Sequence, residues 1–160
     1  MTGVQTCALP IYKFWGYLWQ GAASEALTCN ALEWQVSQGG GSLLNRDGSL
    51  SLEPVHTAET WESARRWIGT LSPPDTANAL EDDSLKVWKQ GEAAFMRNWP
   101  YAYVESQSAD SKVQGVVGVT IMPSGDAPGD HHADTLGGFQ LMVSKTSRNK
   151  DAAIDRKSVV

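Results

Sequence analysis

Basic side chains and cysteines are scarce in this sequence, and long hydrophobic runs are missing. Thirteen lysines and arginines stand against 18 acidic residues, a formal net charge of −5, which argues against the clustered basic face of a nucleic-acid-binding protein. No apolar stretch approaches the ~20 residues that a membrane-spanning helix requires. A phosphate-binding loop, a dinucleotide fingerprint and a nucleophile elbow are also absent, so the sequence predicts no cofactor.

Tryptophan is the residue type in excess. Seven copies occur in 160 residues, a length that corresponds to about one domain, while hydrophobic residues make up an ordinary 41%. Because Trp combines a large flat apolar face with a single donor, several copies must either fill a core or line a binding surface. The seven are Trp15, Trp19, Trp34, Trp61, Trp67, Trp88 and Trp99.

Both ends of the chain resemble translated adapter sequence from short-read sequencing. Residues 1–11 (MTGVQTCALPI) resemble one adapter, and residues 155–160 (DRKSVV) resemble the opposite adapter read up to its stop. We therefore expect the native segment to run from residue 12 to residue 154, truncated at both ends, and adapter residues do not enter the fold prediction. Cys7 falls in the first of these segments, so a disulfide between Cys7 and Cys29 is not inferred.

The spacing of apolar residues predicts a mixed α/β domain. Over residues 23–37, apolar side chains recur at intervals of three and four, with Ser24 as N-cap and three glycines at the end. Asp47 and Gly48 indicate a short hairpin turn. The remaining pattern predicts helices over 57–70, 82–90 and 99–105, strands over 93–97, 116–122 and 138–144, loops over 106–114 and 124–134, and a helix after Asn149. This order is typical of an α/β domain that lacks its beginning.

The first candidate site is an aromatic segment that follows a predicted strand. Trp99, Tyr101 and Tyr103 place three rings within five residues, at the kind of strand end where ligands meet α/β sheets. Sugars present patches of C–H groups that pack on aromatic faces, and their hydroxyls need polar partners such as Asn98. The alternative, which the local pattern leaves open, is that these rings only fill a core.

Two polar clusters and one cysteine are weaker candidates. Residues 130–134 (DHHAD) contain zinc-ligand types, but adjacent histidines point apart in most backbone conformations, so a solvated loop is favoured. The acids at 81–83 could act as the paired carboxylates of a glycoside hydrolase, although acids at a helix start are more typical of an exposed first turn. Cys29 is interpreted as a small buried apolar residue. No metal site is predicted.

Several segments, in a consistent order over residues 14–153, resemble the extracellular sugar-binding proteins of ABC importers. The similarity is closest to the trehalose/maltose-binding branch and most specific at residues 93–103, where AAFMRNWPYAY resembles that branch's AAFxRNWPYAY signature. The LGG turn at 136–138 is also specific. The other similar segments are 14–17 (FWGY), 19–22 (WQGA), 27–33 (LTCNALE), 67–70 (WIGT), 72–74 (SPP), 135–140 (TLGGFQ) and 143–145 (VSK).

The resemblance implies an α/β fold of the periplasmic-binding-protein type II class, with two lobes that close around a sugar by hinge motion. Residues 12–116 would form most of the second lobe. Residues 117–154 would form the hinge crossover and the start of the return to the first lobe. The first-lobe acids that bind sugar hydroxyls in the family lie outside this chain.

The resemblance also implies which residues contact the sugar. Trp99 and Tyr101 would form an apolar floor and Phe139 the facing wall, although Trp is usual at that last position and Phe lacks its indole donor. Ser24 likewise stands where an aromatic ring is common. The backbone at Gly137 and Gly138 would approach the ligand closely because no Cβ intervenes, and Gln20 is a candidate polar neighbour.

The implied function is binding without chemistry. The ligand would be an α-glucoside disaccharide such as trehalose or maltose, and the partners would be ABC permease subunits. The protein would be a monomer in the periplasm or outside the cell, free or lipid-anchored. Three alternatives stay open: a carbohydrate-active hydrolase with two carboxylates around the aromatic faces, a structural module that buries the rings, and an assembly fragment without function of its own.

Overall fold

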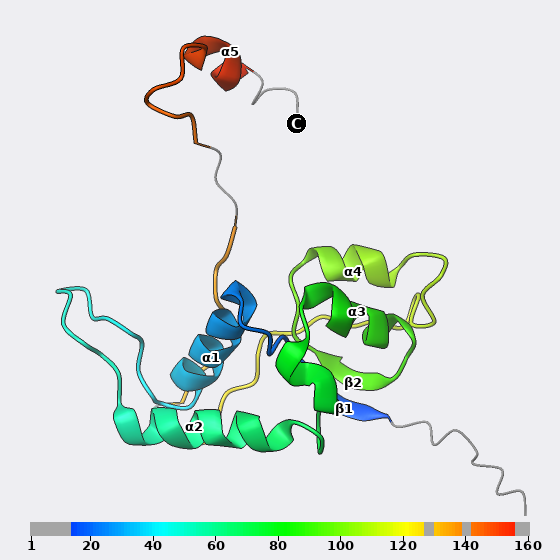
Figure 1. The fold of residues 1–160 in the computed structure, drawn as a ribbon. Helices are drawn as coiled ribbons and strands as arrows, with labels where there is room; N and C mark the ends of the chain where they lie inside the picture. Colours follow the sequence, from blue (N-terminus) through cyan, green and yellow to red (C-terminus); the bar gives the residue numbers. More distant parts are fainter. Residues whose placement is uncertain (1–13, 127–129, 139–141, 156–160) are drawn as a thin grey trace, which may run out of the picture.

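Two short parallel strands form a small sheet in the described part of the chain. The computed structural model describes residues 14–126, 130–138 and 142–155. In it, β1 (Trp15–Leu18) pairs with β2 (Ala93–Met96), so that Trp15 lies opposite Ala93 and Leu18 opposite Met96 (Figure 1). Parallel neighbours need a long crossover connection, and here the whole chain between β1 and β2 forms it.

Helices form that crossover and the part of the chain that follows. The crossover contains α1 (Glu25–Ser37), α2 (Pro54–Trp67), a 3₁₀ helix (Pro74–Asn78) and α3 (Glu81–Lys89), and α4 (Tyr101–Ser106) and α5 (Lys150–Asp155) come after β2. The first helix packs on α2, and α3 packs on both β2 and α4. In Figure 1, α5 lies apart from the other elements. Within the described ranges, no helix is long and apolar enough to cross a membrane.

The helix ends follow local chemistry, with small departures from the prediction. Ser24 is the N-cap of α1, as predicted, but its side chain makes no capping hydrogen bond, and Gly39 follows the helix with φ of 75°. Three residues earlier than predicted, α2 begins at Pro54, because the Glu53 carboxylate accepts a hydrogen bond from the His56 amide at 2.8 Å. The helix ends at Trp67 rather than at residue 70.

Tryptophans from three segments form the hydrophobic core. Trp34 of α1 meets Trp19 and Trp67 edge to face, with ring centroids 5.0 Å and 5.4 Å apart. The small side chain of Ala64 on α2 completes the cluster. The Trp19 indole N–H donates to Ser72 Oγ at 3.0 Å, so this buried donor is satisfied. The core accounts for part of the tryptophan excess noted in the sequence.

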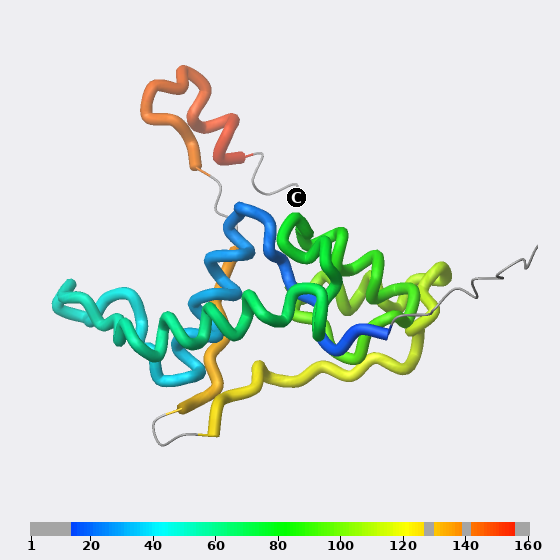
Figure 2. The backbone as a smooth tube through the Cα atoms, turned by 60° about the horizontal axis from the view of Figure 1, so that its bottom comes forward, coloured from blue at the N-terminus to red at the C-terminus, as the bar shows by residue number. Residues whose placement is uncertain are grey.

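After α4 the chain runs back along the domain toward α1. Residues 116–126, yellow in Figure 2, pass from the α3–α4 end to the α1–α2 end, and residues 130–138 then continue beside α1. The Gly125 amide donates to the Ser37 carbonyl at 3.2 Å, and the Thr135 amide donates to Glu33 Oε1 at 3.1 Å. These bonds fix the returning chain against α1.

Three predictions about strands were wrong or incomplete. Residues 116–122 are not a strand, and Val119 is 78% exposed, because no strand in the described part of the chain lies beside them to bond their amides. The predicted hairpin is reduced to one antiparallel bridge between Leu44 and Leu50, around Gly48 with φ of 83°. The pattern also missed β1.

Other predicted segments have mixed outcomes. The predicted helices at 82–90 and 99–105 correspond to α3 and α4, and the predicted strand at 93–97 corresponds to β2. Of the predicted strand at 138–144, residues 139–141 lie outside the described residues, and the others are not in a strand. Residues 1–11 and 156–160 also lie outside the described residues, while Asp155 closes α5.

Candidate functional site

Trp99 is held at its edge by two neighbouring segments. Its backbone N–H donates to Asn98 Oδ1 at 2.8 Å, and its indole N–H donates to Glu81 Oε1 at 3.2 Å. Asn98 in turn donates to the Glu81 carbonyl at 3.1 Å, which ties the turn after β2 to the start of α3. The half-buried indole is therefore fixed in position at both its backbone and its ring nitrogen.

One face and one edge of the Trp99 ring are occupied by protein. The Arg97 guanidinium carbon lies 4.1 Å from the ring centroid, in a cation–π arrangement. Gly137 lies against the far edge of the six-membered ring, so close that a Cβ built on it would lie 2.9 Å from Cη2 and 3.0 Å from Cζ3 of Trp99. A flat ligand can therefore stack only on the ring face opposite Arg97.

Tyr101 follows Trp99 by two residues and is the first residue of α4. Its side chain is 42% exposed, and its hydroxyl donates to Asp82 Oδ1 at 3.2 Å. Partial burial and the adjacent Asp82 carboxylate raise the pKa of Tyr101 to about 12, because both disfavour the phenolate. The residue therefore stays protonated and keeps donating to Asp82 at neutral pH. Tyr101 is exposed and Trp99 is half-buried, and neither belongs to the hydrophobic core cluster.

A buried ion pair lies under the aromatic site. Arg97 Nε donates to Glu33 Oε2 at 3.0 Å and Nη2 donates to Oε1 at 2.6 Å, with the two side chains 5% and 3% exposed. Although burial disfavours the charged guanidinium, the hydrogen bonds to Glu33 and its charge raise the pKa of Arg97 above its ordinary value. The guanidinium therefore stays charged, and the pair joins α1 to the residue that follows β2.

The other predicted contacts have different surroundings. Gln20 is fully buried, and its amide donates to Ser84 Oγ at 2.7 Å and to the Arg97 carbonyl at 2.9 Å. It supports the turn that carries Trp99, and a direct ligand contact from Gln20 stays a prediction. Gly138 has open space where a Cβ would be, and Phe139 lies outside the described residues.

Sequence reasoning assigned no role to three residues that hold this site together. Glu33 carried no local signal, because its partner lies 64 positions further along the chain. Thr135 was quoted only as part of a similar segment, yet its amide bonds Glu33. Arg97 stood inside the most specific segment without an assigned role. A buried carboxylate near an arginine cannot be located without the fold.

The carboxylates near the rings bear on the hydrolase alternative. Glu81 and Asp82 do lie within a few ångströms of Trp99 and Tyr101, but each accepts a hydrogen bond from a donor in the ring plane rather than standing over a ring face. A glycoside hydrolase needs its two carboxyl groups on opposite sides of the scissile bond, whereas these two are neighbours at the start of α3. The arrangement fits anchoring of the rings better than acid–base chemistry.

The histidine cluster gains no support as a zinc site. His132 Nδ1 lies 2.6 Å from the Met122 carbonyl oxygen, an interaction between two parts of the returning chain. In the part of the chain that the structure describes, no group of three or more histidine, cysteine, aspartate or glutamate side chains could hold a metal ion.

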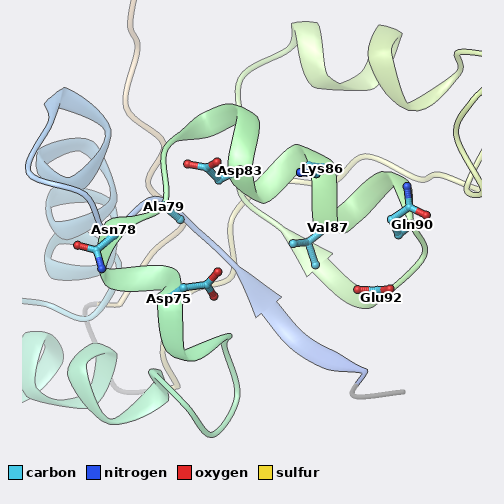
Figure 3. Close-up of a pocket in the computed structure, with 8 residues that line it drawn as sticks. All are labelled: Asp75, Asn78, Ala79, Asp83, Lys86, Val87, Gln90 and Glu92. Atoms are coloured by element: carbon cyan, nitrogen blue, oxygen red, sulfur yellow. The ribbon is translucent and has the colours of Figure 1, made fainter. Parts of the chain in front are cut away.

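A surface hollow lies outside the aromatic site. It has a volume of about 440 Å³ and lies between the 3₁₀ helix and α3 (Figure 3). Its lining mixes carboxylates with one lysine and includes none of Trp99, Tyr101 and Gly137. The lining residues are Asp75, Asn78, Ala79, Asp83, Lys86, Val87, Gln90 and Glu92. The hollow is thus separate from the aromatic site.

Comparison with known proteins decides the family. Residues 8–155 match the family described as bacterial extracellular solute-binding protein. The chain belongs to this family. The solute-binding protein family serves transport and is not an enzyme class, and the predicted resemblance to ABC-importer binding proteins is confirmed.

The relatives that this solute-binding chain matches are considerably longer than the chain itself. A probable ABC transporter-binding protein of Deinococcus radiodurans is 41% identical over 143 residues, which cover 89% of this chain and 34% of the relative. The structure of maltose-bound T. maritima MalE3 has 35% identity and a TM-score of 0.79, over 88% of this chain and 36% of that one. This solute-binding chain therefore spans about a third of the length of the relatives it matches.

A more distant structure supports the fold alone. An ABC transporter solute-binding protein from Agrobacterium radiobacter K84, in complex with ribitol, has a TM-score of 0.76 at 22% identity, over 92% of this chain and 37% of that one. Together these neighbours confirm the predicted α/β fold of the periplasmic solute-binding class.

Proposed function

We propose that this chain is part of the substrate-binding subunit of an ABC sugar importer. Its ligand would be an α-glucoside disaccharide such as maltose or trehalose, stacked on Trp99 and Tyr101. The observation that carries the proposal is the pair of accessible rings fixed by hydrogen bonds to Glu81 and Asp82. The maltose bound by the 35% identical MalE3 supports the choice of sugar.

The chemistry of the site suits a sugar ring. A sugar would stack its C–H groups on the Trp99 face that Arg97 does not cover, and Tyr101 would supply a second ring. A carboxylate has two oxygens, so Glu81 and Asp82 can each hold an aromatic donor with one and accept a sugar hydroxyl with the other. Apolar faces flanked by a few convergent polar groups are typical of small-molecule sites.

The domain arrangement follows from the same proposal. Residues 12–116 would form most of one lobe, and residues 117–154 would form the crossover toward the other lobe. The returning course of residues 116–126 supports this division (Figure 2). Closure of two lobes would enclose the sugar, with Phe139 on the facing wall, and create the surface that the permease subunits recognise. The receptor would be a monomer located in the periplasm or outside the cell, free or lipid-anchored.

The decisive experiment is a sugar titration of a two-lobed receptor. A hybrid in which residues 14–154 replace the matching segment of T. maritima MalE3 supplies a second lobe. Calorimetry with maltose, trehalose and ribitol then ranks the ligands, and the proposal requires that maltose or trehalose binds tighter than ribitol. The isolated 160-residue chain, with one lobe's contacts, is expected to bind these sugars poorly.

Variants locate the binding surface. Burial of one aromatic face contributes about 1.5–3 kcal/mol, so Trp99→Ala should weaken sugar binding roughly 10- to 150-fold. Trp61→Ala is the matched control, because Trp61 is an accessible tryptophan of α2 outside the site. A folded hybrid whose affinity is the same with and without the Trp99 ring would overturn the proposal.

A further inference from the structure

Glu33 and Arg97 form an ion pair that stability alone does not explain. Both side chains are almost fully buried, and the two hydrogen bonds between them are bidentate. Removing two charges from water costs several kcal/mol per ion, and well-packed apolar side chains often stabilise a core as well or better. A buried pair of this kind therefore invites a role in positioning its neighbours.

The pair contacts two parts of the aromatic site at once. On one side, the Arg97 guanidinium carbon lies over the Trp99 ring, 4.1 Å from its centroid. On the other side, Glu33 Oε1 accepts the Thr135 amide at 3.1 Å, and the Thr135 hydroxyl donates to the Cys29 carbonyl at 3.4 Å. The Glu33 carboxylate is thus bonded both to the arginine that covers the ring and to the chain that returns past it.

The two contacts converge again at Trp99. Gly137, two residues after Thr135, touches the far edge of the Trp99 ring. The ring is therefore contacted on one face by Arg97 and on one edge by Gly137, and the Glu33 carboxylate bonds to Arg97 and to Thr135, two residues before Gly137. A second anchor, the bond from the indole N–H to Glu81, does not involve this pair.

We propose that Glu33 is a positioning residue for the sugar platform: its carboxylate locks Arg97 against Trp99 and the 135–137 segment against the ring edge. The value of the platform for sugar binding rests on the function proposed above, whereas the positioning itself does not. Glu33 touches no ligand and acts through Arg97 and Thr135. Rigid first contacts supported by a second layer of hydrogen bonds are a general requirement for a tight site.

Two substitutions separate positioning from charge. Glu33→Gln keeps the size of the side chain, but its NH₂ group faces an Arg97 donor, so the bidentate pairing is lost. Arg97→Lys keeps the positive charge but lacks the planar fork that both pairs with a carboxylate and stacks on an indole. Glu62→Gln is the control, because Glu62 makes an exposed bidentate pair with Arg65 on α2.

The ligand-free readout is nuclear magnetic resonance of the 160-residue chain. The Trp99 indole N–H, assigned with Trp99→Phe, and the Gly137 amide should both shift in Glu33→Gln and in Arg97→Lys, and neither should shift in Glu62→Gln. The indole N–H of Trp88, which donates to Ser106 Oγ at 3.0 Å, reports on the remainder of the fold and should not move.

The sugar readout uses the two-lobed hybrid. Glu33→Gln should weaken the binding of maltose or trehalose roughly tenfold, the order of effect expected when a supporting contact to a ligand group is lost. If the hybrid binds neither sugar but the Trp99 and Gly137 signals still respond to Glu33→Gln, the proposed function fails and the positioning role stands.

Three results would overturn the positioning role itself. The first is a Glu33→Gln chain with unchanged Trp99 and Gly137 signals. The second is simultaneous loss of the Trp99, Gly137 and Trp88 signals, because general unfolding would make the pair a stabilising contact only. Unaltered sugar affinity in a Glu33→Gln hybrid would count against it in the same way.

Discussion

Replacement of Gly137 by alanine should displace the Trp99 ring. A Cβ at this position would lie 2.9 Å from Cη2 and 3.0 Å from Cζ3, whereas non-bonded carbons settle at about 3.5–4.0 Å. The ring must therefore move by roughly 0.5–1 Å. Such a movement strains the indole bond to Glu81 or the contact with Arg97. Overpacking of this kind costs about 1–3 kcal/mol.

Urea unfolding followed by tryptophan fluorescence measures this cost. If the free energy of unfolding falls by about 2 kcal/mol per molar urea, Gly137→Ala should lower the urea concentration at the unfolding midpoint by roughly 0.5–1.5 M. Gly138→Ala is the matched control one position further, because a Cβ there meets nothing within 4 Å and φ is not in the positive range. Equal midpoints for the two alanine variants would refute the packing of Gly137 on Trp99.

Three further outcomes are expected. Tyr101 should ionise near pH 12, and the phenolate absorbance that appears there should be missing in Tyr101→Phe. Because the pKa of tyrosine in the unfolded chain is about 10, the stabilisation from the protonated Tyr101 hydroxyl is complete below pH 10 and is lost between pH 10 and 12. Trp34→Ala, in the core, should lower the free energy of unfolding by about 3–5 kcal/mol in urea titration, against about 1 kcal/mol or less for the exposed Trp61→Ala. Cys29, in a background without the other cysteine, should react with a thiol reagent at pH 8 only after urea is added, because burial raises the pKa of its thiol and blocks access.

The helices could be predicted because their signals are local. The apolar spacing of residues 23–37 and the acids that open α3 describe structures whose hydrogen bonds close within a few residues. Strand pairing is different, since a strand exists only beside a partner. The β-branched run at 116–122 has strand propensity, but no neighbour in the described part of the chain bonds to it. The missed β1 is a strand because β2 lies next to it.

In the candidate site too, features that are local in the sequence could be predicted and contacts between distant residues could not. Trp99 and Tyr101 could be proposed from one short segment, because their rings are close in sequence and follow a strand. The residues that hold them could not: Glu33 reaches Arg97 across 64 positions, and Thr135 reaches Glu33 across 102. The spacing of residues along the sequence does not indicate which distant charged side chains pair with each other in the interior. The resemblance to a family pointed to Trp99 and Tyr101 but assigned no role to the residues that hold them.

The pairing of β1 with β2 has a consequence for how this domain acquires its structure during translation. Trp15 and Ala93 are neighbours in the sheet although about 80 residues separate them along the chain. At a ribosomal rate of about 5–20 residues per second, the aromatic segment of β1 waits roughly 4–16 s before its partner has been synthesised. For that interval β1 lacks the partner strand to which its backbone groups bond, so an unpaired strand is open to pairing with other chains until β2 has been made.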